Sequence, residues 1–179
     1  MISGTLVNLT PLEQEDLEPL RLWRNNPEFR KYFREYREIS KDMQRQWYQQ
    51  KVLSDPGTLM FAIRGAKTGE LLGCCGLCYI NWIHRNADLS LYIGWRNAYI
   101  DDIGYAEESC RLLFAYGFKE LGLEKIWTEI YAFDAPKHAL YQKLGFQQDG
   151  LLRRQYQYDG RWWDSRILSL LRDEFPAQT

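Results

Sequence analysis

The chain has 179 residues, of which 45% are hydrophobic and 26% are charged, as in a globular domain large enough to bury one core. Its formal net charge of −1 supplies no basic field, which argues against nucleic acid or an anionic membrane as a partner. The sequence shows no signal-peptide pattern and no apolar run of membrane-span length. We therefore expect one domain over residues 1–179, located in the cytoplasm.

Four cysteines include a C-x-x-C pair at Cys75 and Cys78, a spacing that also occurs in metal and redox sites. The apolar run around this pair predicts a strand, in which residues three apart point to opposite faces of the sheet. Two side chains on opposite faces cannot bind one ion. We expect these cysteines to be small buried side chains, and we expect no metal site.

Helical and strand patterns follow one another in the first half of the chain. Pro27 interrupts the first helical pattern, and Ser40 is the expected N-cap of the second. Two apolar runs flank a turn at residues 65–69, which is typical of an antiparallel hairpin. The expected elements are a strand at 5–9, helices at 12–25 and 41–53, and strands at 58–64, 70–80 and 88–93.

The second half contains the longest helical pattern, at residues 104–121, where apolar side chains recur on one face. A strand is expected at 125–132, and then a short helix that Asp134 caps and Gly145 ends. The Asp159-Gly160 pair predicts a tight turn between strands at 151–158 and 162–170. The fold class is therefore α+β, with a mixed, mainly antiparallel sheet flanked by helices.

Residues 101–106 open the longest helix after a strand and a loop. Backbone amides at a helix start are unpaired, the helix dipole is positive there, and Gly104 and Ala106 let a phosphate approach the backbone. The pattern indicates an anion site. Ordinary helix packing produces the same Gly-x-Ala pattern, so this alternative stays open.

A more specific signal lies at residues 134–146, which end in Tyr141-Gln142-Lys143-Leu144-Gly145-Phe146. This segment resembles the N-x(6)-Y-x-K-L-G-F motif of the GNAT superfamily of acetyltransferases, and the element order is similar over the whole chain. Gly150-Leu151-Leu152-Arg153, Asp159-Gly160 and Asp164 resemble the ribosomal-protein alanine and polyamine acetyltransferase branch. The resemblance implies a GNAT-like fold and the transfer of an acetyl group from acetyl-CoA to a primary amine.

The resemblance also implies roles for single residues. Tyr141 stands at the position of the general acid that assists the departing thiolate, and Asp88 stands near the position of the general base. The alternatives are a core tyrosine and a strand-starting aspartate. The residues expected to bind acetyl-CoA are Tyr92, Ile93 and Gly94 for the pantetheine arm, Asp102, Ile103, Gly104, Tyr105 and Ala106 for the pyrophosphate, and Asp134, Lys137 and Lys143.

One position departs from the family motif. Asp101 stands where the family has Arg or Gln, and a second acidic residue follows it. Two carboxylates near a pyrophosphate repel it by about 1 kcal/mol each at a solvated surface. We expect Asp101 or Asp102 to cap the helix and point away, leaving the amides free. The alternative is a weakened cofactor site.

The acceptor is expected to bind between the two early helices and the loop after the third strand. The candidate contacts are Trp23, Asn25, Tyr32, Trp82 and His84. Polyamines, amino sugars and protein N-termini all remain possible acceptors. The competing hypothesis is a catalytically silent module of the same fold that binds acyl-CoA or a protein partner. A homodimer is compatible with either hypothesis.

Overall fold

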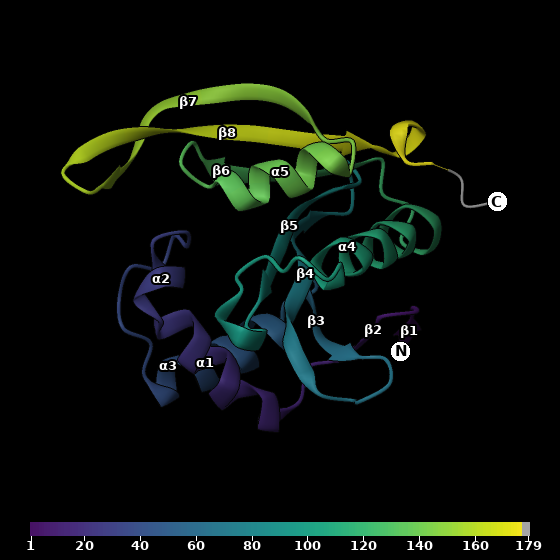
Figure 1. The fold of residues 1–179 in the computed structure, drawn as a ribbon. Coiled ribbons are helices and arrows are strands. Elements are labelled where there is room, and N and C mark those ends of the chain that lie inside the picture. Colours follow the sequence, from purple (N-terminus) through teal and green to yellow (C-terminus); the bar gives the residue numbers. More distant parts are fainter. Residues whose placement is uncertain (177–179) are drawn as a thin grey trace.

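The computed structural model describes residues 1–176, and within them one mixed sheet carries helices on both faces (Figure 1). The strands are β1 (Ile2–Ser3), β2 (Val7–Pro11), β3 (Leu59–Gly65), β4 (Leu71–Asn81), β5 (Asn86–Ile93), β6 (Lys125–Tyr131), β7 (Gln147–Tyr158) and β8 (Arg161–Leu171). The α-helices are α1 (Leu17–Asn25), α2 (Pro27–Arg30), α3 (Lys41–Trp47), α4 (Tyr105–Ala115) and α5 (Ala135–Lys143). Single π-type turns extend α3 and α4, at Tyr48–Val52 and Tyr116–Glu120.

The sheet order is β1-β2-β3-β4-β5-β6-β8-β7, and β5–β6 is its one parallel pair within the described part of the chain. This confirms the predicted fold class. The parallel register joins Asn86–Asp88 to Lys125–Trp127 and then ends, although both strands continue. Beyond it, the Thr128 hydroxyl donates to the Leu89 carbonyl over 3.3 Å. The two halves of the sheet are thus joined by a short seam.

Several local signals fold as predicted. Ser40 Oγ accepts from the Met43 amide at 3.1 Å, and Asp134 Oδ1 accepts from the Lys137 amide at 3.1 Å. Gly145 ends α5 with a φ of 89°. Asp159 and Gly160 both have positive φ values, as the tight hairpin turn requires.

The early helices differ from the prediction. Residues 14–16 form a separate 3-10 turn, so the first α-helix begins at Leu17 rather than at residue 12. Pro27 does not only end α1; it also opens α2, whose cap is the Asn26 side chain accepting from the Glu28 amide at 3.0 Å. A proline ring sets the φ of a first helical position, and its missing amide is unpaired there in any case.

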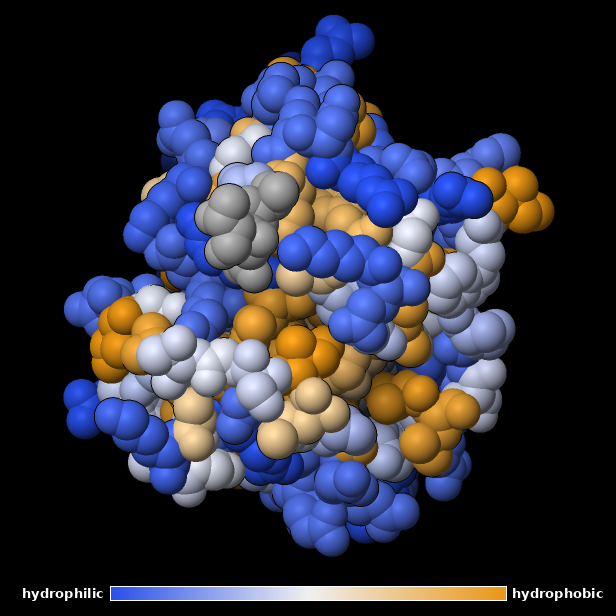
Figure 2. Space-filling view, turned by 90° about the vertical axis from the view of Figure 1, so that its right-hand side faces the viewer, coloured by the Kyte–Doolittle hydropathy of each residue, from blue (hydrophilic) through white to orange (hydrophobic). Residues whose placement is uncertain are grey.

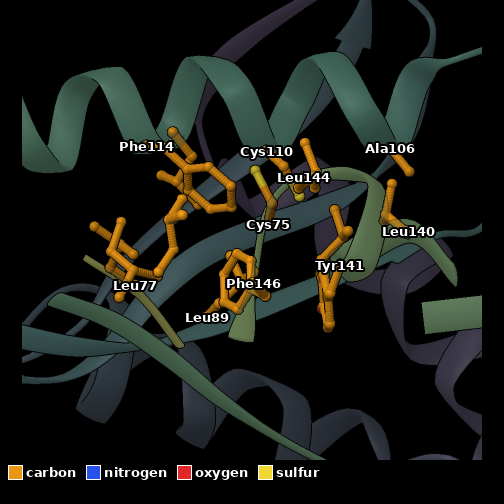
Figure 3. Packing of buried hydrophobic residues seen from close by; sticks show 14 of the residues in the cluster. Cys75, Leu77, Leu89, Ala106, Cys110, Phe114, Leu140, Tyr141, Leu144 and Phe146 are labelled. Atoms are coloured by element: carbon orange, nitrogen blue, oxygen red, sulfur yellow. The ribbon is translucent and has the colours of Figure 1, made fainter. Parts of the chain in front are cut away.

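Two apolar clusters lie on opposite faces of the sheet. The first packs beneath α4 and α5 and contains Cys75 and Tyr141, both labelled in Figure 3. The second packs beneath α1–α3 and contains Cys74, with Cys78 against it. The prediction that Cys75 and Cys78 face opposite ways is confirmed. Burial raises the pKa of the Cys78 thiol to about 12, so it stays a protonated packing group.

None of the helices within residues 1–176 is long and apolar enough to cross a membrane. In the same residues, no group of three or more His, Cys, Asp or Glu side chains is placed to hold a metal ion. Figure 2 shows the face on which the N-terminus lies, with apolar residues near its centre and hydrophilic residues around them.

Candidate active site

The start of α4 gathers four backbone amides on one carboxylate. Asp101 Oδ2 accepts from the amides of Ile103, Gly104 and Tyr105 at 3.0, 2.7 and 2.8 Å, and its Oδ1 accepts from Ala106 at 2.8 Å. Gly104, with a φ of 112°, makes the turn that lets the loop fold back over the helix end. The prediction that the amides are free is therefore wrong. Unpaired amides at a helix start take the nearest anion, which here belongs to the chain itself.

The amides expected to pair with pantetheine are also engaged. Ile93 donates to the Tyr99 carbonyl at 2.8 Å, and Gly94 donates to the Leu72 carbonyl at 2.9 Å. The ring of Tyr92 is buried in the second cluster, and Trp23 packs so closely on Gly94 that a Cβ there would lie 1.9 Å from its ring. The predicted pantetheine donors at Ile93 and Gly94 are corrected accordingly, because other carbonyls already accept from both amides.

Asp134 lies at the centre of a buried polar group beside α5. Its Oδ2 accepts from the Tyr99 hydroxyl at 2.5 Å, and burial raises the pKa of this carboxyl. The Lys137 ammonium lies 5.3 Å from the centre of the Tyr99 ring and 5.9 Å from that of Phe33, and burial lowers its pKa. Lys137 thus lies among aromatic rings and does not line the groove at the start of α4, and its contact with acetyl-CoA stays a prediction.

Lys143 is placed differently. Its ammonium contacts Glu107 Oε2 at 2.5 Å at the edge of a groove of about 330 Å³ between α4 and α5. This groove is lined by Ile100, Asp101, Asp102, Ile103, Gly104, Glu107, Pro136, Ala139, Leu140 and Lys143. Lys143 and the exposed Asp102 therefore lie where the sequence places the phosphates of the cosubstrate.

Asp88 lies on β5 at the last residue of the short parallel seam and is 8% exposed. Its Oδ2 is 3.8 Å from Arg34 Nη1, and Arg34 Nη2 is 3.1 Å from Glu129 Oε2. Burial raises the pKa of Asp88 to about 6, against the opposing effect of Arg34. A carboxyl with this pKa is well suited to accept a proton near neutral pH.

Sequence reasoning missed Arg34 and Glu129. Glu129 had a signal, because it is a charged residue inside the strand at 125–132 on the same face as Trp127, which pairs with Asp88. Arg34 had no local signal. It reaches the site from the loop after α2, and only the folded chain brings it there.

Tyr141 is fully buried on α5 and lies among apolar side chains below α4 (Figure 3). Its ring stacks on that of Phe146 at 5.2 Å between centres. Its hydroxyl makes no hydrogen bond of ordinary geometry within residues 1–176; burial raises its pKa well above the ordinary value, and the nearby Thr128 hydroxyl opposes that rise. An orphaned hydroxyl inside a core costs stability, so it calls for an explanation beyond packing.

The predicted acceptor contacts have diverse roles. Tyr32 stacks on Tyr99 at 4.1 Å between ring centres, and its ring centre lies 6.0 Å from that of Phe133. The Asn25 side chain instead bonds both the amide and the carbonyl of Ile39, which ties a loop. Trp82 is exposed and donates to the Pro56 carbonyl, and His84 is exposed in the β4–β5 turn. The acceptor contacts of these four residues stay predictions.

A pocket of about 210 Å³ between the early helices and the sheet was not predicted. Arg24 lines it, and the Nε of this side chain is buried without a hydrogen-bond partner within the described residues. The Arg24 guanidinium lies 4.2 Å from the centre of the Phe33 ring. The full lining is Leu20, Arg24, Glu35, Ile39, Met43, Gln44, Trp47, Met60, Cys74, Cys78, Ser90 and Tyr92.

The strand order, the short parallel seam and the amide-rich helix start together have the arrangement expected of an acyltransferase. The family model described as "Acetyltransferase (GNAT) domain" matches residues 7–147, so the chain belongs to the GNAT acetyltransferase family. Membership confirms the predicted family, the predicted enzyme class of N-acetyltransferase, and acetyl-CoA as the cosubstrate that this class uses.

Similar proteins extend over nearly the whole chain. Spermidine N(1)-acetyltransferase of Escherichia coli K12 is 26% identical and covers 99% of this chain and 92% of its own length. The corresponding protein of Vibrio cholerae is 28% identical, with coverages of 94% and 95%. The crystal structure of the Vibrio cholerae enzyme in complex with CoA and spermine superposes with a TM-score of 0.85 at 26% identity, covering 96% and 98%.

Proposed function

We propose that this chain acetylates a primary amine of a polyamine, with acetyl-CoA as the donor. The observation that carries the proposal is the position of Arg34 between Asp88 and Glu129. At the end of the parallel seam, a cationic side chain of the protein itself thus bridges two carboxylates. A polyamine ammonium has the same charge and would bind the same pair. The two spermidine acetyltransferases that match almost end to end support this acceptor class.

Aromatic rings surround this part of the sheet and suit a chain of amines. Tyr131 stacks on Tyr156 at 4.0 Å, and Phe133 lies 5.0 Å from Tyr158 and 6.0 Å from Tyr32. Ring faces attract ammonium groups and also pack against the methylene segments between them. The acceptor would thus lie along β6 and the β7–β8 hairpin, with its reactive amine next to Asp88.

The proposed reaction is a direct attack of the amine on the thioester carbonyl. Asp88, with a pKa of about 6, takes the proton from the amine directly or through water. Tyr141 faces the departing thiolate. Its pKa exceeds the ~8.5 of an ordinary thiol, so it stabilises the thiolate mainly by donating a hydrogen bond. This role would also satisfy the hydroxyl that is orphaned in the resting protein.

The residues present fit the two ends of acetyl-CoA unequally. The β5–β6 ladder ends at Asp88 and Trp127, where the pantetheine arm would enter, and Tyr141 has an unpartnered hydroxyl for the thioester end. At the phosphate end, Lys143 lines the groove but is paired with Glu107, and Asp101 holds the amides. The thioester end is therefore well matched, and the pyrophosphate end has a competitor.

A second acceptor class is an amine that also carries a carboxylate, such as an amino acid or a peptide N-terminus. The buried, unpartnered Nε of Arg24 in the 210 Å³ pocket favours it, because a carboxylate would satisfy that donor. The silent-module alternative is not favoured, since the long matches are acetyltransferases. Cytoplasmic location, a single domain and a homodimer stay predictions.

Release of free CoA thiol tests the function. The protein is incubated with acetyl-CoA and, separately, spermidine, spermine, an amino sugar and a peptide with a free N-terminus. We expect turnover with the polyamines, and we expect Asp88→Asn to lower kcat by roughly 10²- to 10⁴-fold. Arg24→Ala should reduce turnover of the peptide more than that of spermidine. No thiol release with any amine at saturating concentration would reject the proposal, and a peptide preference would favour the second class.

A further inference from the structure

The amides of Ile103, Gly104, Tyr105 and Ala106 form a cradle for one anion, and the Asp101 carboxylate fills it. All four donor-acceptor distances lie between 2.7 and 3.0 Å. Amide bonds to an ionised oxygen are stronger than neutral ones, and the dipole of α4 adds to them. The geometry is that of an anion-binding helix start whose anion is supplied from within the chain.

Within residues 1–176, Asp101 forms no ion pair with a cationic side chain. The ionisable residues that line the groove at this helix start are Asp101, Asp102, Glu107 and Lys143. The Glu107 carboxylate forms ion pairs with the Lys143 ammonium at 2.5 Å and with the Arg111 guanidinium at 3.0 Å. The charge of Asp101 is therefore balanced by the cradle amides, and a second anion in the groove would meet three carboxylates.

We propose that Asp101 is a built-in competitor of the acetyl-CoA pyrophosphate and sets the affinity for the cosubstrate. The same four amides cannot serve the carboxylate and a pyrophosphate together, so Asp101 leaves the cradle before the phosphates enter. The apparent affinity is then reduced by the small fraction of molecules in which the cradle is open. This inference rests on acetyl-CoA as the donor, and it does not depend on which amine is acetylated.

The loop around Asp101 has few contacts that would hold the Asp101 side chain at the helix start. Asp102 is exposed and the Ile103 side chain is 47% exposed, so neither anchors the segment in the core. Tyr99, two residues earlier, is firmly held by its bond to Asp134 and its stack on Tyr32. Ile100, directly before Asp101, packs against both apolar clusters, so the movement that releases Asp101 is confined to residues 101–103.

Calorimetric titration with CoA and with pantetheine, which lacks the pyrophosphate, tests the competitor. Asp101→Ala empties the cradle, and Asp101→Asn keeps the side-chain shape without the charge. Asp102→Ala is the matched control, because it removes one carboxylate from the same groove but none from the cradle. Inorganic pyrophosphate serves as a competing probe in each titration.

We expect Asp101→Ala to bind CoA at least tenfold more tightly than wild type, or about 1.4 kcal/mol. Pantetheine affinity stays within about twofold, which also shows that the variant is folded. Asp101→Asn gives a smaller gain, Asp102→Ala less than about threefold, and pyrophosphate competes with CoA much better in Asp101→Ala than in wild type. Equal or weaker CoA binding by Asp101→Ala, or an equal gain with Asp102→Ala, would overturn the inference. Tighter CoA binding without transfer to any amine would instead reject the proposed function.

Discussion

The hydroxyl of Tyr99 donates a 2.5 Å hydrogen bond to Asp134 Oδ2, and this buried pair ties the loop before α4 to the cap of α5. Tyr99 also accepts from the Ile93 amide and has a φ of 61°, an uncommon value for a bulky residue. The backbone strain persists because three sets of contacts hold the residue. One tyrosine thereby joins β5, the loop that carries Asp101, and α5.

Tyr99→Phe should lower the free energy of unfolding by about 1–3 kcal/mol, because Asp134 loses a donor while buried. The ring stack with Tyr32 is kept, so the loss reports the hydroxyl alone. Urea unfolding measures this loss of stability. The control is Tyr36→Phe, because the Tyr36 side chain is 76% exposed. In the Asp134→Asn background the same change should cost less. Equal losses in both backgrounds would contradict the pairing.

Tyr141→Phe should reduce acetyl transfer without lowering stability. Its hydroxyl is buried without a partner, so the ring without it should be as stable as wild type or more so. We expect kcat to fall by roughly 10- to 10³-fold as the hydrogen bond to the thiolate is lost. The paired experiment is Tyr48→Phe, which removes a buried hydroxyl that donates to the Leu12 carbonyl at 3.0 Å. That variant should lose about 1 kcal/mol of stability. A large stability loss in Tyr141→Phe would indicate a structural role.

Asp88 should make the folded protein less stable as pH rises. Its pKa is about 6 when folded, against 3.8 for the ordinary group, so the folded state favours the protonated form. Relative to Asp88→Asn, wild type should lose on the order of 2–3 kcal/mol between about pH 4 and pH 7. Arg34, Lys137 and Glu129 are the charged groups that face it. Unfolding curves of both proteins across this range measure the difference, and parallel curves would show that Asp88 titrates normally.

The same ionisation should appear in the pH dependence of kcat/KM. As the proposed base, Asp88 works only as a carboxylate, so kcat/KM should rise with pH and level off above about 6. Glu129→Gln removes a neighbouring negative charge that raises the Asp88 pKa, and should move the rise to lower pH. If the rise of kcat/KM with pH occurs at the same pH in Glu129→Gln as in wild type, the ionisation belongs to another group.

Glu108 should be needed to hold the N-terminal strands against α4. Its carboxylate accepts from the amides of Thr5, Leu6 and Val7 at 3.0, 2.7 and 2.8 Å. Glu108→Gln keeps one acceptor oxygen but loses the charge, so we expect a loss of about 1–3 kcal/mol in unfolding free energy. Glu120→Gln, on an exposed turn at the far end of the helix, provides the comparison. Similar unfolding free energies for the two variants would mean that hydrogen bonds from the three amides to water are as stabilising as those to Glu108.

The sequence predicted best what depends on a few neighbouring residues. Ser40, Asp134 and the Asp159-Gly160 turn all work locally, since a cap or a tight turn needs only its own backbone. The element order around Tyr141 was correct for the same reason: helical and strand periods are local. Pro27 interrupts the first helix as predicted, but the short helix that it opens was not predicted, because a proline both ends one helix and begins the next.

Asp101 and Lys137 show what sequence alone could not supply. Asp101 or Asp102 was expected to cap the helix and point away, and Lys137 was expected to contact acetyl-CoA. Asp101 folds back because the turn at Gly104 brings the cradle amides within reach. Lys137 points inward because Phe33 and Tyr99, distant in sequence, form its aromatic surroundings. Side-chain direction at these positions is decided by the tertiary fold.

The short parallel seam between β5 and β6 has a consequence for how the protein opens. Only three residue pairs carry the backbone ladder from the β1–β5 half of the sheet to the β6–β8–β7 half. Amide protons on either side of the seam should therefore exchange with solvent as two separate groups, each with its own protection. A molecule that inserts between the diverging strands adds rungs to that ladder, so it would merge the two groups and slow exchange in both.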